Sequence, residues 1–452
     1  MIEESTAGVD AVGVAPERQA LANDATAAAP PRAANLLQIL GPGLITGASD
    51  DDPSGIATYS QAGAQFGFDL GWTLVLTWPL MCAIQEISAR IGRVTGRGIA
   101  GNLQRHYPRS LMIGLISLLL VANVINLGAD LGAMAAALTL VIGGPQLLYV
   151  ALFAALSLLL EVFVRYQRYV SVLKWLTLSL FAYVGVAFVV HMPWASVAYH
   201  LVVPTVSLKP GYLTVVVAVL GTTISPYLFF WQAQEEVDDA KERPGARPLE
   251  RAQEQAPAEF HRIRVDTYIG MAFSNVVALF IVLTTAATLH AHGITDIQTS
   301  AQAALALKPI AGPFVFEVFA LGIVGTGLLA VPVLAGSAAY AVGEAVGWHV
   351  GLARRLPRAR AFYGLILLAF AVGALLNYVH IDPIKALFWS AVLNGVVAVP
   401  MMALIMHLAS GKAAMGDLRI HIGLKVVGWL ATAAMAAAAV GMFATMAMGG
   451  GS

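Results

Sequence analysis

Eleven apolar segments, each long enough to cross a lipid bilayer, constrain the fold of this 452-residue chain more than any other feature. A membrane-spanning helix needs about 17 to 25 predominantly apolar residues. Backbone polar groups cannot stay unpaired in lipid, so a spanning segment is a helix or part of a closed barrel. The segments lie near residues 38–63, 70–90, 111–141, 146–164, 169–191, 211–234, 267–290, 313–346, 361–378, 384–408 and 422–446. The sequence therefore predicts an all-α polytopic membrane protein with the lipid bilayer as its surroundings.

The composition supports this class and excludes others. Hydrophobic residues make up 58% of the chain and charged residues 12%, which is typical of membrane proteins. The 26 basic and 26 acidic residues balance, so nothing indicates a nucleic-acid partner. The single cysteine, Cys82, excludes an intrachain disulfide and a paired-cysteine metal motif.

The basic residues predict the orientation. With the amino terminus in the cytoplasm, every Lys and Arg except Lys209, Lys308 and Lys385 falls on the cytoplasmic side, as the positive-inside rule requires. An odd number of spans then places the carboxyl terminus outside. We expect a multi-pass protein of the plasma or inner membrane.

The predicted organisation is one transporter domain behind a polar tail. The first 36 residues are rich in Ala and Pro and lack the pattern of a signal peptide, so we expect a disordered cytoplasmic tail there. The charged stretch Val237–Arg264 holds three prolines and is expected to be a loose linker. The predicted boundaries are 1–36 for the tail, 37–446 for the transmembrane domain, 37–191 and 211–410 for two repeats, 192–210 for their connection and 422–446 for an extra helix.

The first apolar segment contains three consecutive carboxylates, in Asp50-Asp51-Asp52-Pro53-Ser54-Gly55. A charge at the bilayer centre costs about 2.5 to 3.5 kcal/mol, so such residues face protein or water and commonly mark an ion path. Pro53 removes a backbone donor and Gly55 tolerates unusual dihedral angles, so the helix is expected to break here. Free carbonyl groups beside a carboxylate form a cation site.

The sixth segment carries a second interruption, Leu220-Gly221-Thr222-Thr223-Ile224-Ser225-Pro226-Tyr227. Because the two breaks are five helices apart and an odd repeat inverts in the membrane, the pattern predicts an inverted repeat with a site at the midplane. Gly and Pro are common in transmembrane helices, which remains an alternative explanation for the second break.

At these residues the chain resembles the NRAMP family of divalent metal transporters, from about Leu37 onward. Asp52-Pro53-Ser54-Gly55 is similar to the family's Asp-Pro-Gly-Asn, and Thr222–Tyr227 to its Ala-x-x-Met-Pro-His. Gln85–Arg90, followed by Val94–Gly98, resembles the second helix, and Asp130 the third-helix aspartate. The resemblance implies a LeuT-like fold of two inverted five-helix repeats plus an eleventh helix, with the first and sixth helices broken at mid-membrane.

The departures from the family pattern concern the metal ligands. Gly55 stands where the family has an asparagine, Ser225 where it has a methionine and Thr222 where it has an alanine. Thioethers favour softer metals, whereas carboxylate, hydroxyl and carbonyl oxygens suit Mg²⁺, Ca²⁺ and Mn²⁺. A wider, oxygen-lined site suits the partly hydrated Mg²⁺ ion. The pattern resembles the NRAMP-related magnesium transporters, so we expect transport of Mg²⁺ and Mn²⁺.

Further departures concern proton coupling. Tyr227 replaces the family's histidine and Ala133 its third-helix glutamate. Proton relays near neutral pH need histidine or perturbed carboxylates. We therefore expect weak or absent proton coupling.

The candidate metal-site residues are Asp52, Thr222, Ser225 and Gly55, with Asp130 and Asn394 as further candidates. Asn394 could instead join helices by hydrogen bonds. Asp50 and Asp51 could line a funnel for incoming cations.

Residues near the cytoplasmic ends complete the predicted path. Glu86 could pair with Arg90 or line an aqueous path. Gln232, Gln234, Glu235 and Glu236 could line the cytoplasmic exit or form a solvated helix end.

Other functions remain as alternatives to a secondary transporter of divalent cations. They are a proton-coupled Mn²⁺ or Fe²⁺ importer in which Asp130 handles the proton, an amino-acid or organic-substrate symporter, and a passive channel or metal sensor. The acidic first break argues against an anionic substrate. The chain has no His-Glu-x-x-His motif, and Gly411-Lys412-Ala413 lacks the pattern of a nucleotide loop, so we expect neither an enzyme nor ATP. We expect no cofactor, the metal being the substrate, and the sequence leaves the oligomeric state open.

Overall fold

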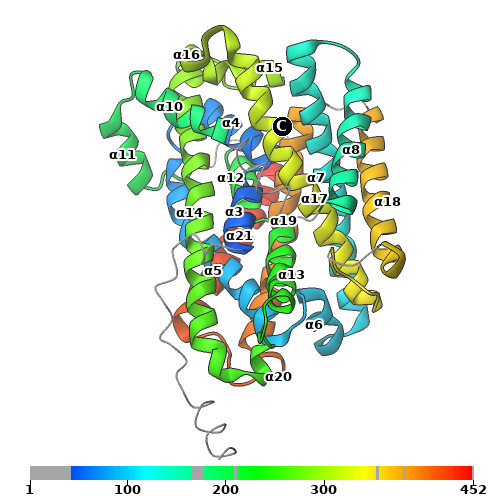
Figure 1. Cartoon of the computed structure of the whole chain (residues 1–452). Helices are drawn as coiled ribbons and strands as arrows, with labels where there is room; N and C mark the ends of the chain where they lie inside the picture. Colours follow the sequence, from blue (N-terminus) through cyan, green and yellow to red (C-terminus); the bar gives the residue numbers. More distant parts are fainter. Residues whose placement is uncertain (1–41, 165–177, 208–210, 353–355, 380–381, 450–452) are drawn as a thin grey trace, which may run out of the picture. The chain divides into compact units, whose positions relative to one another are not determined.

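A computed structural model describes residues 42–164, 178–207, 211–352, 356–379 and 382–449 and shows a bundle of long helices (Figure 1). The predicted tail, residues 1–36, lies outside the described residues, as does the start of the predicted fifth span. The long helices are α3 (Pro42–Asp50), α4 (Pro53–Phe66), α5 (Gly71–Thr95), α7 (Arg109–Ile142), α8 (Gln146–Phe163), α10 (Phe181–Val189), α12 (Tyr212–Thr223), α13 (Pro226–Glu242), α14 (Ala256–Thr288), α17 (Val315–Val346), α18 (Arg360–Leu376), α19 (Pro383–Ser410) and α21 (Ile422–Gly449).

These helices match the predicted spans in order. Within the described residues, nine helical stretches are long and apolar enough to cross a membrane. The first predicted span is the pair α3 and α4, too short singly to be among those nine. The fifth is represented by α10, which follows a short 3₁₀ turn, Leu178–Leu180. The prediction of an apolar helical bundle is therefore confirmed.

The first break falls where the sequence predicts it. α3 ends at Asp50, and α4 begins at Pro53 with Asp52 as its N-cap. The extended backbone of Asp52, with φ −71° and ψ 169°, lets its side chain accept a hydrogen bond from the backbone N–H of Gly55. Proline suits the first helical position because the N–H there has no intrahelical partner. The acidic triplet thus ends one half-helix and begins the next.

The second break has the same construction without a charge. α12 ends at Thr223, and α13 begins at Pro226 with Ser225 as its extended N-cap residue. The Ser225 side chain makes no capping bond to α13. Both breaks therefore place a proline at the start of the second half-helix.

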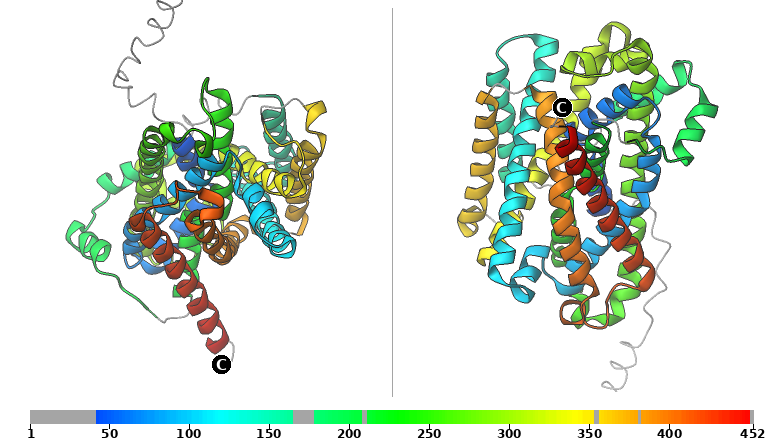
Figure 2. Two further views of the ribbon diagram at one scale, coloured as in Figure 1. Left: turned by 90° about the horizontal axis from the view of Figure 1, so that it is seen from below. Right: turned by 180° about the vertical axis from the view of Figure 1, so that it is seen from behind.

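Close helix packing brings the two breaks together. α4 packs against α12, α14 and α19, and α12 packs along α19. Gly221 of α12 faces Gly395 of α19, and a Cβ atom at either glycine would collide with the backbone of the opposite helix. The last helix, α21, runs beside α19 (Figure 2) and also contacts α5 and α12. Because Gly221 and Gly395 have no side chains, α12 can pack close to α19.

The expectation of a loose linker over Val237–Arg264 is wrong. α13 continues to Glu242 and α14 begins at Ala256. Arg262 pairs with Glu236 and with Glu259, and Arg93 of α5 lies 3.0 Å from Glu259. These charges link three helices, which a composition argument based on prolines could not anticipate.

The connections contain several short helices that apolar length cannot predict. They are α6 (Ile99–His106), α11 (Trp194–Val202), α15 (Ser300–Ala304), α16 (Lys308–Ala311) and α20 (Lys412–Met415). α11 lies within the predicted connection of residues 192–210.

Candidate metal site

Asp52 is the most heavily bonded side chain at the first break. Its Oδ1 accepts hydrogen bonds from Ser54 Oγ at 2.6 Å and from Gly55 N at 2.7 Å. Its Oδ2 accepts from Asn126 Nδ2 at 3.1 Å and from Tyr227 Oη at 3.2 Å. The side chain is almost fully buried. Two donors belong to its own half-helix and two come from α7 and α13, so the carboxylate joins three helices.

Asn126 is a part of this site that sequence reasoning missed. Its Oδ1 accepts a 2.6 Å hydrogen bond from Ser390 Oγ of α19, so Ser390, Asn126 and Asp52 form a continuous chain. The spacing of the polar residues in α7 and α19 could have indicated this chain of hydrogen bonds. Asn126 lies four residues before Asp130, and Ser390 four residues before Asn394, which places each pair on one helical face.

Asp50 and Asp51 share one donor. Ser274 Oγ of α14 lies 2.7 Å from Asp50 Oδ2 and 3.0 Å from Asp51 Oδ1. Both carboxylates are buried, with 0% and 2% of their surface exposed. The expectation that they line a funnel for incoming cations is therefore wrong for this structure, because an open funnel would leave them accessible.

The second break presents neutral oxygens. Ser225 Oγ donates to the carbonyl oxygens of Gly221 and Thr222, at 2.9 and 2.8 Å, and its lone pairs remain available as acceptors. Thr222 Oγ1 is buried, with the Tyr59 side chain beside it. That oxygen would lie 3.2 Å from a Cβ atom at Gly55. The missing side chain of Gly55 therefore leaves room for the Thr222 hydroxyl beside the first break.

Asp130 and Asn394 occupy different surroundings. Asp130 is fully buried on α7 and close enough to Asp52 for the two charges to interact. The backbone N–H of Ser54, in the first turn of α4, also lies close to the Asp130 carboxylate. Asn394 is buried on α19 beside Gly395, and its Nδ2 has no partner within the described ranges. Metal binding by either residue remains a prediction.

Glu86 is an ion-pair partner. Its Oε1 lies 2.5 Å from Arg90 Nη2 and 3.4 Å from Arg264 Nε. The interpretation of Glu86 as a structural partner of Arg90 is confirmed, and Arg264 of α14 is an addition that the sequence did not indicate.

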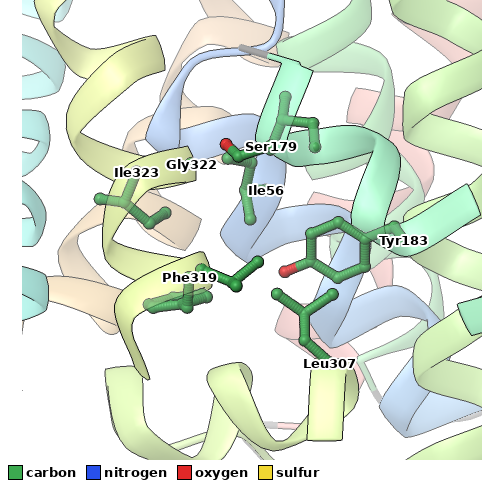
Figure 3. Close-up of a pocket in the computed structure, with 9 residues that line it drawn as sticks. Ile56, Ser179, Tyr183, Leu307, Phe319, Gly322 and Ile323 are labelled. Carbon is green, nitrogen blue, oxygen red and sulfur yellow. The ribbon is translucent and has the colours of Figure 1, made fainter. Parts of the chain in front are cut away.

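Two hollows lie apart from Asp52. A cavity of about 470 Å³ lies between the end of α4, the start of α12 and the start of α19, with Gln61, Asp296, Lys385 and Trp389 among its lining residues. A smaller hollow is lined by apolar side chains such as Phe319 and Ile323 around Tyr183 (Figure 3). Asp52 lines neither, and with 1% of its surface exposed it is shielded from solvent in this structure.

No group of three or more His, Cys, Asp or Glu side chains within the described residues is arranged to hold a metal ion. A cation at the breaks would therefore be held by at most two carboxylates together with hydroxyl, amide and carbonyl oxygens. Mg²⁺ is commonly bound in this way, by one or two carboxylates with retained waters.

Comparison with known proteins gives one family for nearly the whole chain. Residues 43–445 match the profile of Nramp, natural resistance-associated macrophage protein-like. A relative from Klebsiella pneumoniae, named divalent metal cation transporter MntH, is 27% identical over 402 residues, which cover 87% of this chain and 90% of the relative. A second MntH from another strain is 27% identical over 406 residues, covering 88% and 91%.

Solved structures show the same fold. A manganese transporter from Eremococcus coleocola superposes with a TM-score of 0.77 at 17% identity, covering 93% of this chain and 90% of the other. The nucleobase-cation-symport-1 family transporter Mhp1, in a closed conformation, superposes with a TM-score of 0.57 at 13% identity, covering 90% and 92%. The predicted LeuT-like fold, with two inverted five-helix repeats, an eleventh helix and two broken helices, is confirmed.

Proposed function

The chain belongs to the Nramp family, and from this premise we propose that it is a secondary transporter that carries divalent metal cations across a membrane by alternating access. The names of its relatives, divalent metal cation transporter and manganese transporter, support the substrate class. We place it in the plasma or inner membrane with the amino terminus in the cytoplasm, because the basic residues follow that orientation.

The observation that carries this proposal is the position of Asp52. Its buried carboxylate lies at the first break and accepts a hydrogen bond from Tyr227, the second residue of α13 beyond the other break. A buried carboxylate costs free energy unless donors or a cation compensate it. Asp52 would supply the charge for the metal, and Asn126 and Tyr227 would stabilise the carboxylate when no metal is bound.

The finer proposal is a preference for Mg²⁺ and Mn²⁺. Asp52, Thr222 and Ser225 offer only oxygen, and Gly55 leaves the space beside Thr222 free. Oxygen ligands suit these hard cations, and a site without a thioether gives no advantage to softer metals. A partly hydrated ion would use the neutral oxygens through its waters.

Weak or absent proton coupling is the second finer proposal. Tyr227 donates a hydrogen bond to Asp52. The family pattern has a histidine at this position, and a histidine would titrate near neutral pH whereas a tyrosine does not. Ala133 has no titratable group. Metal movement would then follow the metal gradient and the membrane potential.

A second candidate function has one specific observation in its favour. Asp130 is fully buried and close to Asp52, and no basic side chain is paired with it among the described residues. A carboxylate in such surroundings could carry a proton, which would make the protein a proton-coupled importer of Mn²⁺ or Fe²⁺.

One experiment separates the two candidates. Proteoliposomes that contain the purified protein and an internal pH dye are given Mg²⁺, Mn²⁺, Ca²⁺, Fe²⁺ or Cd²⁺ outside. We expect saturable uptake of Mg²⁺ and Mn²⁺ with little acidification. Strong acidification driven by Mn²⁺ or Fe²⁺, without Mg²⁺ uptake, would support the second candidate and contradict the first.

A further inference from the structure

A second group of oxygen ligands lies where α6 and α13 meet the end of α17, far along α13 from the breaks. Glu344 of α17 accepts hydrogen bonds from the backbone N–H groups of Gly98 and Gly101, at 2.9 and 2.8 Å. Its carboxylate therefore caps the first turn of α6. Each carboxylate oxygen has two lone pairs, so both remain able to bind a cation.

Gln234 of α13 points into the same place. A Cβ atom added at Gly98 would lie 2.5 Å from Glu344 Oε2, 2.8 Å from Glu344 Oε1 and 2.8 Å from Gln234 Oε1. Three oxygens thus approach one point, which is open because residue 98 is glycine. Gln234 has 2% of its surface exposed, and its Oε1 has no hydrogen-bond partner in the part of the chain that the structure describes.

The orphaned oxygen cannot be satisfied by turning the amide over. Gln234 Nε2 donates to Asp238 Oδ1 at 3.2 Å, so the amide lies between the carboxylates of Asp238 and Glu344. An amide has one NH₂ group and one oxygen. Either orientation leaves that oxygen on the side of a carboxylate, and a cation between the two acceptors would satisfy both.

Among the described residues, no basic side chain forms an ion pair with Glu344. Lys241, the one cation on α13, lies 2.8 Å from Asp238 Oδ1 and acts on Glu344 only through its charge at longer range. Asp238 Oδ2 accepts a hydrogen bond from Tyr340 Oη at 3.0 Å. Glu235 lies close to Asp238, Asp238 is close enough to Glu344 for their charges to interact, and Asp239 is paired with Arg243. The remaining surplus of carboxylates attracts cations.

We propose that Glu344 and Gln234 form a second binding site for a hydrated divalent cation, the last position of the metal before it leaves on the side of the basic loops. One carboxylate, one amide oxygen and retained waters suit Mg²⁺ or Mn²⁺. Gln234 lies nine positions after Ser225 on the same helix, about 13 Å farther along the axis. The assignment of the cation as the transported metal rests on the proposed function; the existence of the site does not.

Mn²⁺ binding to the full chain in detergent tests this site. Asp52→Ala removes the carboxylate proposed to hold the metal at the breaks, so the Mn²⁺ that still binds is read by paramagnetic resonance and displaced with Mg²⁺. We expect one weak site to remain in Asp52→Ala. Adding Gly98→Ala, which places a methyl group among the three oxygens, weakens that binding about tenfold or more. Glu344→Gln and Gln234→Met have the same effect.

Gly98→Ala is the decisive variant because it should fold. Gly98 has φ −64°, which alanine adopts freely, and the atoms that its Cβ would meet are the ends of flexible side chains. Gly364→Ala on α18, where a Cβ would meet nothing within 4 Å, is the matched control and leaves binding unchanged. The proposal is overturned if Asp52→Ala binds no Mn²⁺ up to about 10 mM, or if Gly98→Ala and Glu344→Gln bind as tightly as the control.

The reciprocal variant distinguishes metal binding at the breaks from metal binding at the second site. Glu344→Gln retains Asp52 and reports binding at the breaks alone. Failure of the proposed function would appear as metal uptake by Asp52→Ala equal to that of the wild type, whatever the second site binds. Failure of the second site would leave Asp52-dependent binding intact in Glu344→Gln.

Discussion

The two broken helices share a construction but differ in what they bond to. At the first break, Asp52 receives donors from α7 and α13 as well as from its own half-helix, and Asp50 and Asp51 share Ser274 of α14. At the second break, Ser225 Oγ donates only to carbonyl oxygens of the preceding half-helix. The carboxylate of the first break is therefore hydrogen-bonded to neighbouring helices, whereas the hydroxyl of Ser225 at the second break is hydrogen-bonded within its own helix.

This difference assigns separate roles to the breaks. The first supplies the negative charge and depends on other helices to compensate it when no cation is present. The second supplies neutral oxygens, and its position depends on close packing of Gly221 against Gly395. Changes at the first break should therefore alter binding strongly, whereas changes at the second should alter selectivity or helix packing.

The largest effect is expected from Asp52→Ala. The change removes the charge proposed to bind the metal and the acceptor of Asn126, so uptake in proteoliposomes should fall to the background of empty vesicles. Asp69→Asn is the control, because its side chain is half-exposed and pairs with His200, at 3.2 Å. Mg²⁺ flux through Asp52→Ala that matched this control would refute the placement of the charge.

A large effect on stability is expected from Gly221→Ala. The added methyl group would collide with the backbone of Ala391 and Gly395, so α12 and α19 must separate. Overpacking of this kind costs about 1 to 3 kcal/mol, which thermal unfolding in detergent would detect as a lower midpoint. Gly364→Ala should unfold like the wild type. Equal midpoints for the two variants would show that close packing does not position the second break.

A change in selectivity is expected from the double variant Gly55→Asn and Ser225→Met, which adds an amide and a thioether to the site. The ratio of Cd²⁺ or Fe²⁺ uptake to Mg²⁺ uptake should rise, because thioether sulfur favours softer metals. Competition among metals in one vesicle preparation measures this ratio. If the order of metals does not change, the argument from ligand softness is wrong.

The smallest effect is expected from Tyr227→Phe. It removes one of the four hydrogen bonds to Asp52 and leaves the others. A hydrogen bond to a charged group contributes about 1.5 to 3 kcal/mol, but a metal at Asp52 would replace that bond. We therefore expect apparent metal affinity to change only several-fold, as measured by the concentration for half-maximal uptake. Complete loss of uptake would mean that Tyr227 itself is indispensable.

The helices and their breaks could be predicted because the physics is local. Apolar length identifies the spans, and Pro53 and Pro226 begin the second half-helices where proline is tolerated. Asp52 stood out because a carboxylate in an apolar segment is rare. These signals need no knowledge of which helices touch.

The partners of Asp52 could not be predicted in the same way. Asn126 and Ser390 are single polar residues in long apolar helices, and nothing local tells a ligand from a residue that joins two helices. The burial of Asp50 and Asp51 depends on Ser274, more than two hundred residues away. The sequence points to Asn394 on α19, yet the hydrogen bond to Asn126 comes from Ser390, one helical turn earlier.

Anomalous diffraction from crystals grown with Mn²⁺ tests the central claim most directly, because it locates the metal without any assumption about flux. We predict a peak about 2 to 2.6 Å from a carboxylate oxygen of Asp52, between the two breaks and facing the oxygens of Thr222 and Ser225. A peak at Asp130 with none at Asp52, in crystals that bind Mn²⁺, would contradict the account.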